Sequence, residues 1–176
     1  CGIDVSRETM PRLWIYAGLA AKWQPAINLI GPSTLPSIWE RHFLDSAQLL
    51  SLMAPDERRI ADFGSGAGFP GLVLAILSSR IVHLIEADSR KCAFLRQVAI
   101  ETGILAQITI HNARAEKLAP FPVDVVTARA LAPLDILIGM VAPFVAPGGR
   151  CLLHKGQASD AELTRARKLW HMRVAR

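Results

Sequence analysis

The pattern of apolar and polar positions changes near residue 59. Before it, apolar residues recur at helical spacing after Thr9 and Pro11, and a Ser37-Ile38-Trp39-Glu40 capping box predicts a second helix to about Met53. After it, short apolar runs alternate with segments of helical period. These runs predict strands at Ile60–Phe63, Ile81–Glu86, Gln107–His111, Val123–Thr127 and Arg150–Leu153. Helices are predicted at Pro70–Leu77, Ser89–Thr102, Leu134–Val145 and after Ser159.

Alternating strands and helices are typical of an α/β fold with a mostly parallel sheet and helices on both of its faces. The chain has 176 residues, which suits one compact domain. We therefore predict a helical cap over residues 1–58 joined to a Rossmann-like core over residues 59–176. Hydrophobic residues make up 51% of the chain, so most segments should be buried on at least one side.

The junction between the first predicted strand and the next helix is rich in glycine, with the sequence Asp62-Phe63-Gly64-Ser65-Gly66-Ala67-Gly68-Phe69-Pro70-Gly71. Glycine has no Cβ, so a bound cofactor can approach the backbone closely there. The N-terminus of the following helix points at the same place. Glu86 ends the second predicted strand about 20 residues later, where nucleotide-binding α/β folds hold a ribose hydroxyl group. The pattern predicts a cofactor site at this edge of the sheet.

Two cofactors compete for this site. The run from Gly66 to Gly71 matches the dinucleotide fingerprint G-x-G-x-x-G, which is a weak signal by itself. Asp62 favours S-adenosylmethionine, because a carboxylate at this position can pair with an ammonium group that NAD lacks. Pro70 removes one of the backbone N–H groups that a pyrophosphate needs, and it suits the first helical position. S-adenosylmethionine is therefore the predicted cofactor.

Charge is distributed unevenly along the chain. The net charge is +5, and residues 121–176 hold eight basic and four acidic residues. A basic surface of this kind suits a polyanionic partner. It suits equally a solvated helix face at Arg165, Arg167 and Lys168.

Cysteine usage and hydropathy bear on location. Cys1, Cys92 and Cys151 form an odd, scattered set, which suggests reduced thiols in a cytosolic protein. The longest apolar stretch contains Asp135 and three prolines, so we expect no membrane span, and the N-terminus predicts no secretory leader.

Several runs together resemble one family. They are Asn28-Leu29-Ile30, Glu40-Arg41-His42-Phe43-Leu44-Asp45-Ser46, the glycine run, Ala113-Arg114-Ala115-Glu116, Thr127-Ala128-Arg129-Ala130 and His154-Lys155-Gly156. In this order, over nearly the whole chain, they resemble the bacterial 16S rRNA guanine-N7 methyltransferases, the glucose-inhibited division protein B family. The resemblance implies a class I S-adenosylmethionine-dependent methyltransferase fold. It also implies a cytoplasmic enzyme that methylates N7 of one guanine, in free 16S rRNA or in the small ribosomal subunit.

The resemblance has one departure, at the C-terminus. Sheets of this class usually end in an antiparallel hairpin, and Leu169–Arg176 is too short to form it. We therefore expect the closing strands to be incomplete in this chain.

The residues after the fourth predicted strand bear on which atom is methylated. Exocyclic amines are usually held by Asn or Asp before Pro-Pro-aromatic, whereas this chain has Thr127-Ala128-Arg129-Ala130-Leu131. Carbon 5 of a pyrimidine needs a cysteine nucleophile in a loop, but Cys92 and Cys151 fall in a predicted helix and strand. Guanine N7 carries a lone pair and no proton, so positioning alone can supply roughly 7–11 kcal/mol of the barrier. The lack of an evident general base is consistent with N7.

The candidate site residues form two groups. The predicted cofactor-binding residues are Asp62, Gly64, Gly66, Gly68, Phe69, Glu86, Ala115, Glu116 and Arg129. The predicted contacts to RNA or the target base are Arg41, His42, Asp45, Ser46 and Lys155, and Arg129 and Lys155 are expected to position the substrate. Both follow predicted strands, at the edge of the sheet where ligands bind. The backbone N–H groups of Ala115 and Glu116 are expected to hold the adenine ring.

Each assignment has a structural alternative. Phe69 suits ordinary core packing, Arg129 a salt bridge, and Lys155 a solvated position. His42, Asp45 and Ser46 share one helix face, and together they suit a hydrogen-bond network that braces the cap. Glu116 suits a helix N-terminal acid.

Three other functions stay open at this point. They are a small-molecule methyltransferase, an NAD(P)-binding oxidoreductase, and a non-catalytic RNA-binding module. The chain offers no second histidine cluster, so a metal site is not expected, and we expect a monomer.

Overall fold

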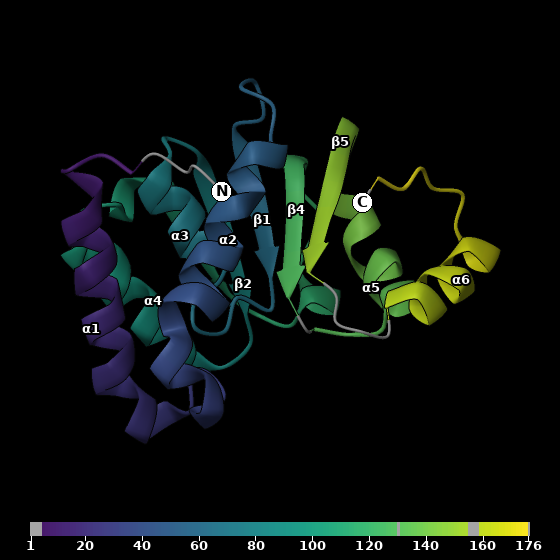
Figure 1. Ribbon diagram of the computed structural model, residues 1–176. Helices are drawn as coiled ribbons and strands as arrows, with labels where there is room; N and C mark the ends of the chain where they lie inside the picture. The colour runs from purple at the N-terminus through teal and green to yellow at the C-terminus, as the bar shows by residue number, and fades with distance from the viewer. Residues whose placement is uncertain (1–4, 130, 155–158, 176) are drawn as a thin grey trace.

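A parallel β-sheet forms the centre of the molecule (Figure 1). The computed structural model describes residues 5–129, 131–154 and 159–175. Within them the sheet has five strands in the order β3-β2-β1-β4-β5, all parallel. The strands are β1 (Arg59–Phe63), β2 (Ile81–Glu86), β3 (Ile108–Asn112), β4 (Val123–Arg129) and β5 (Val145–His154). The predicted Rossmann-like architecture is confirmed.

Helices cover both faces of the sheet (Figure 1). The longer α-helices are α1 (Thr9–Ile27), α3 (Gly71–Leu77), α4 (Ser89–Glu101), α5 (Leu134–Val141) and α6 (Ser159–Leu169). The shorter helical pieces are η1 (Pro32–Ser37), η2 (Trp39–Leu44), α2 (Asp45–Ala47), η3 (Gln48–Leu52), η4 (Leu105–Gln107), η5 (Ala115–Lys117) and η6 (Ala142–Phe144). Elements α1 to α4 pack on one face, whereas α5 packs on the other with α6 beside it.

The central strand β1 is apolar on both sides because each side meets a helical layer. In β1, Ile60 belongs to the core cluster beneath α1, α3 and α4. The neighbouring Ala61 and Phe63 belong to the cluster beneath α5. All three side chains are fully buried. Such continuous apolar runs are typical of strands in a sheet covered on both faces, which is why the sequence pattern located them.

The predicted capping box at Ser37 is wrong. Ser37 ends η1, and Ile38 after it has φ −57° and ψ −36°, so the chain stays helical into η2. A capping residue needs non-helical backbone angles. The Ser37 hydroxyl instead donates to the carbonyl oxygen of Thr34 at 3.5 Å. The segment to Leu52 is helical as expected, but it changes type, and η2 is a π-helix.

The boundary between α5 and β5 also differs from the prediction. The helix ends at Val141, three residues of 3₁₀-helix follow, and β5 begins at Val145. Pro143 cannot donate a backbone hydrogen bond, which favours this early end. Gly148 then adopts φ +81° where the pairing of β4 with β5 shifts register. The irregular start of β5 explains why the apolar pattern located only its second half.

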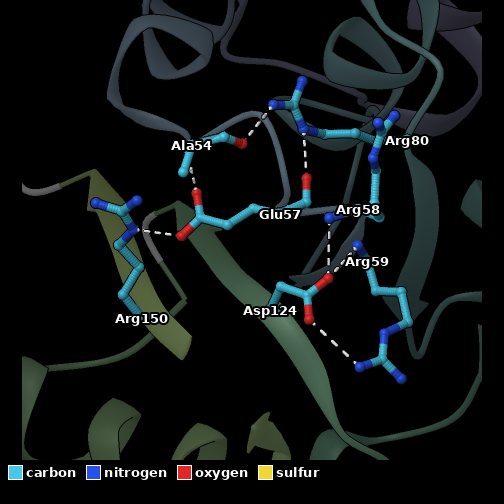
Figure 2. Close-up of polar contacts among 7 residues, drawn as sticks. All are labelled: Ala54, Glu57, Arg58, Arg59, Arg80, Asp124 and Arg150. Carbon is cyan, nitrogen blue, oxygen red and sulfur yellow. Dashed lines mark hydrogen bonds and ion pairs between the residues drawn. The ribbon is translucent and has the colours of Figure 1, made fainter. Parts of the chain in front are cut away.

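Acidic side chains tie the amino ends of the strands together (Figure 2). The Asp124 carboxylate, at the start of β4, accepts backbone N–H groups of Arg58 and Arg59 at 2.9 and 2.8 Å. It also pairs with the Arg59 guanidinium at 3.3 Å. Burial raises the pKa of Asp124, but these hydrogen bonds outweigh that effect, and its pKa is lowered overall.

Glu57 makes a second junction at this edge (Figure 2). Its carboxylate accepts Arg150 Nε from β5 at 2.6 Å and the Ala54 N–H at 2.7 Å. Its carbonyl oxygen accepts Arg80 Nε at 2.7 Å. The amino edge is thereby fixed by side chains that take no part in the opposite, carboxyl edge.

Two further observations concern the rest of the chain. Among the described residues, 170–175 form neither helix nor strand, so the described sheet ends at β5. Trp170 packs back on α5, where its indole N–H donates to the Asp135 carbonyl oxygen at 3.1 Å. No helix in the described part of the chain is long and apolar enough to cross a bilayer.

Candidate functional site

The glycine run forms a tight turn between β1 and α3 at the carboxyl edge of the sheet. Gly64, Gly66 and Gly68 have φ of +68°, +54° and +91°, which residues with a Cβ rarely adopt. A Cβ on Gly68 would lie 2.4 Å from Leu72 Cδ1. A Cβ on Gly66 would meet nothing closer than the Gly64 carbonyl oxygen, at 3.7 Å. The turn is therefore packed beneath Gly68 and open above Gly66, as a cofactor cradle requires.

Asp62 lies beneath this turn and has no exposed surface. Its carboxylate accepts the Thr127 hydroxyl at 2.8 Å and the Gly71 N–H at 3.3 Å. Burial raises the pKa of Asp62 to about 7, although these hydrogen bonds work against the rise. The structure thus shows Asp62 linking β1, β4 and α3 around the turn. Its predicted contact with an ammonium group stays a prediction.

Glu86 lies at the end of β2, beside the glycine turn. One carboxylate oxygen accepts the Gly66 N–H and the other accepts the Asp88 N–H, both at 2.8 Å. A carboxylate has about four acceptor positions, so Glu86 keeps acceptor capacity for ribose hydroxyls. Glu86 and the glycine turn, which were predicted to lie together, are in contact in the fold.

The end of β3 brings a further segment to Glu86. The Ala113 N–H donates to the Glu86 carbonyl oxygen at 3.1 Å. Ala115 and Glu116 then begin η5, and the first N–H groups of any helix have no partner within it. Ala115 is half-buried and the Glu116 side chain is exposed. This segment can therefore present backbone donors to a ligand, and its predicted contact with the adenine ring stays a prediction.

An aromatic cluster supports the turn from the cap side. Phe69 is 5% exposed and stacks on Tyr16 of α1, with ring centroids 5.1 Å apart. It also packs against Phe43 and His42. The Tyr16 hydroxyl donates to the Ala67 carbonyl oxygen at 2.5 Å. Phe69 thus has the core packing that was its structural alternative, and Tyr16 is a contact to the turn that the sequence analysis missed.

The predicted RNA residues are placed at different depths. Arg41 is exposed and Asp45 half-buried, whereas His42 and Ser46 are 7% and 1% exposed. The Ser46 hydroxyl donates to the His42 carbonyl oxygen at 2.6 Å, and His42 Nε2 lies 2.9 Å from Thr34 Oγ1. Burial, with a smaller effect of Arg129, lowers the His42 pKa to about 4. These contacts are those of a network that braces the cap.

Arg129 ends β4 and reaches across to this helical segment. Its Nη2 donates to the Arg41 carbonyl oxygen at 2.9 Å. Burial lowers the Arg129 pKa, and nearby Asp45 partly offsets this. The salt bridge considered as the structural role of Arg129 is not seen among the described residues. Arg129 instead makes the hydrogen bond to the Arg41 carbonyl oxygen. Lys155 lies outside the described residues.

His154 is the partner of Arg129 on the next strand. The two are paired in register across β4 and β5, and His154 Nε2 lies 3.2 Å from the Asp45 carbonyl oxygen. The sequence analysis quoted His154 within a motif but gave it no role. Its position directly after a predicted strand was a weak signal, and its place beside Arg129 is known only from the register of the strands.

Sequence comparison shows the relationship of this chain. The family model described as rRNA small subunit methyltransferase G matches residues 9–176. The chain belongs to this family. It is 55% identical over 172 residues to ribosomal RNA small subunit methyltransferase G of Paramagnetospirillum magneticum, covering 98% of this chain and 83% of the relative. It is 57% identical to the protein of that name from Rhodospirillum centenum, covering 97% and 78% of the two chains.

Solved structures share the fold of this family member at low identity. A SAM-dependent O-methyltransferase from Thermotoga maritima superposes with a TM-score of 0.62 at 17% identity, over 85% of this chain and 54% of the other. A ribosomal protein L11 methylase from Lactobacillus delbrueckii gives a TM-score of 0.62 at 16% identity, over 74% and 72%. The methyltransferase fold expected from the resemblance is confirmed.

One side chain outside the predicted set covers the glycine turn of this family member. Leu131, just past β4, lies so close that a Cβ on Gly64 would be 2.7 Å from its Cδ1. This contact was not predictable from the sequence, because Leu131 and Gly64 are distant in the chain. Among the described residues, no three His, Cys, Asp or Glu side chains are grouped to hold a metal ion.

Proposed function

We propose that this chain transfers a methyl group from S-adenosylmethionine to N7 of a guanine in 16S rRNA. The observation that carries the proposal is the family match over residues 9–176, on a chain whose glycine turn and Glu86 meet at the carboxyl edge of the sheet. Ligands bind at this edge in sheets of this topology.

The residues at the turn fit S-adenosylmethionine. Glu86 would accept the ribose hydroxyls, and the N–H groups of Ala115 and Glu116 would hold the adenine. The open backbone above Gly66 would lie along the rest of the cofactor. The remaining proposed cofactor residues are Asp62, Gly64, Gly68, Phe69 and Arg129. When bound, the cofactor supplies an electrophilic methyl group on a sulfonium sulfur.

The chain's own task at N7 is to position the base. N7 of guanine carries a lone pair and loses no proton, so no general base is needed. Cys151 is a poor nucleophile, because burial raises its pKa to about 11. Arg129 lies at the strand end, where a guanidinium can donate to the base. These features favour N7 over the pyrimidine C5 alternative.

The RNA side of the proposal rests on charge and on the cap. Arg165, Arg167 and Lys168 are exposed on α6, which suits contact with phosphates. The proposed contacts nearer the base are Arg41, His42, Asp45, Ser46 and Lys155. Residues 1–58 are proposed to act as a cap on a core of residues 59–176. We propose that the protein is a monomer in the cytoplasm. Its substrate would be free 16S rRNA or the small ribosomal subunit.

The test is transfer of labelled methyl from S-adenosylmethionine to small-subunit particles or rRNA from cells that lack the enzyme. We expect the label in 7-methylguanosine. Glu86→Ala should weaken cofactor binding by about 1–3 kcal/mol, because it removes acceptors from buried hydroxyls. Glu101→Ala, an exposed acid at the end of α4, is the matched control.

Other outcomes would redirect the assignment. Label in another nucleoside would overturn N7 as the target atom. Cofactor binding without transfer to RNA would favour a small-molecule methyltransferase or a non-catalytic RNA-binding module. Tight binding of NADH in place of S-adenosylmethionine would favour an oxidoreductase.

A further inference from the structure

Two side chains at adjacent strand ends hold the same helical segment. Arg129 and His154 are paired in register on β4 and β5, so their side chains point to the same face of the sheet. Arg129 Nη2 donates to the Arg41 carbonyl oxygen, and His154 Nε2 lies 3.2 Å from the Asp45 carbonyl oxygen. Each side chain thus uses one nitrogen to contact the backbone of the cap.

A second nitrogen of each side chain is buried without a partner among the described residues. Arg129 Nη1 and His154 Nδ1 have no hydrogen bond within the described part of the chain. Leaving such a group unpaired is unfavourable, so an unpaired group in a native site calls for an explanation. Both side chains keep some exposed surface, but these two atoms are themselves covered, so a ligand at this edge must displace what covers them.

The chemistry of the two free atoms differs. A carbonyl oxygen can only accept, so the contact with Asp45 places a proton on His154 Nε2. Burial, helped by Arg129, lowers the His154 pKa, and Asp45 opposes this without reversing it, so the ring is neutral near pH 7. Nδ1 is then an acceptor. Arg129 Nη1 is a donor, because a guanidinium has no acceptor.

We propose that this donor and acceptor recognise the target guanine, with Arg129 Nη1 donating to O6 and His154 Nδ1 accepting from N1–H. The proposal rests on the proposed function and names specificity residues for it. Guanine presents O6 and N1–H side by side on one edge. Adenine presents a donor and an acceptor there in the opposite order, so both contacts would fail. Contact along this edge leaves N7 free to face the methyl group.

The test compares target bases in otherwise identical substrates. Small-subunit particles are assembled from rRNA in which the target guanosine is replaced by inosine or by 2-aminopurine. Inosine keeps O6 and N1–H, whereas 2-aminopurine lacks both and keeps N7. We expect the wild-type chain to methylate inosine within a few-fold of guanosine, and 2-aminopurine at least about 100-fold more slowly.

His154→Gln separates recognition from bracing. The glutamine amide can still donate to the Asp45 carbonyl oxygen, but it places no acceptor where Nδ1 lies. We expect the inosine to 2-aminopurine rate ratio to fall at least about tenfold, with little change in cofactor affinity. Comparing ratios between two proteins cancels the intrinsic reactivity of each base. His171→Gln, at an exposed histidine, is the matched control.

The outcomes discriminate between the two proposals. Equal methylation of inosine and 2-aminopurine by the wild-type chain would overturn the recognition of guanine, and this measurement needs no variant. An unchanged ratio in folded His154→Gln would overturn the role of His154. Failure of the wild-type chain to methylate guanine-containing particles would overturn the proposed function, and this inference with it.

Discussion

At the scale of single residues, Asp62 is a buried carboxylate whose burial favours the protonated form, while its proposed role requires the ionised form. Its carboxylate is fully buried, and burial raises its pKa to about 7. It nevertheless lies beneath the turn where the proposed cofactor carries an ammonium group. A nearby cation stabilises the ionised carboxylate and lowers its pKa. Cofactor binding should therefore favour the ionised form of Asp62.

This coupling predicts that the affinity for S-adenosylmethionine falls as the pH drops. Below a pKa of about 7 the free protein holds Asp62 increasingly protonated, and binding must then release that proton. Between pH 7.5 and pH 6 we expect the dissociation constant to rise roughly tenfold. Calorimetric titration at several pH values measures the change.

A ligand without the ammonium group is the control for Asp62. Methylthioadenosine has the adenosine part of the cofactor and no amino acid part, so its affinity should stay constant over the same range. If both ligands respond equally to pH, Asp62 does not sense the ammonium group. A flat profile for S-adenosylmethionine would leave Asp62 with its bracing role alone.

At the scale of elements, the two edges of the sheet have separate roles. The carboxyl edge holds the glycine turn, Glu86 and Arg129. The amino edge is held by Asp124 and Glu57, which lie at the opposite ends of the strands (Figure 2). A change at the amino edge should therefore alter stability and leave methyl transfer intact.

Asp124→Ala tests this separation. The change leaves two backbone N–H groups, of Arg58 and Arg59, without their acceptor, so we expect the free energy of unfolding to fall by about 1–3 kcal/mol. Urea denaturation measures it, and the rate of methyl transfer at saturating substrate should not change. Asp56→Ala, at an exposed acid in the loop before β1, is the control. A loss of turnover larger than the loss of stability would contradict the separation.

The elements that the sequence predicted best are those whose signal is local. Four of the strands begin within a residue of their predicted start, because short runs rich in apolar and β-branched residues mark them. The glycine turn was predictable for a similar reason, since only glycine serves the positive φ of Gly64, Gly66 and Gly68. Glu86 followed from its spacing to that turn.

Features that depend on distant contacts were not predictable. The residues from Ser37 to Glu40 match the sequence pattern of a capping box. The chain is already helical at Ser37, however, so Ser37 does not act as a helix N-cap. Tyr16 reaches the turn from a helix 51 residues away, and nothing in its own sequence context marks it. His154 became visible only once register pairing set it beside Arg129.

At the scale of the whole molecule, the cap and the sheet contribute to the same hydrophobic core. The cluster that contains Leu13, Tyr16 and Phe43 from the cap also contains Leu72 and Phe94 from α3 and α4. A continuous core of this kind favours unfolding as one unit. The second cluster, beneath α5, lies on the far face of the sheet and borders a pair of histidines.

This histidine pair should make the stability of the whole chain depend on pH. His83 Nδ1 lies 3.0 Å from His111 Nε2, so one ring must donate and the other accept. Burial lowers the pKa of both, and for His83 the neighbouring His111 adds to the effect. A histidine whose pKa is lower in the folded chain binds more protons when unfolded. Stability is therefore lost as the pH falls below about 6.5.

His111→Phe isolates the contribution of His111, because His83, Asp62 and the other titrating groups are present in both proteins. Phenylalanine keeps the stacking on Phe121, whose ring lies 5.1 Å from His111. Relative to the wild type, we expect the variant to gain unfolding free energy between pH 7 and pH 5, because it lacks the ring whose pKa is lowered by burial. Urea denaturation at both pH values measures the gain. His171→Phe, at an exposed histidine, should show none. A constant difference between wild type and His111→Phe would mean that His111 binds a proton as readily in the folded chain as in the unfolded one.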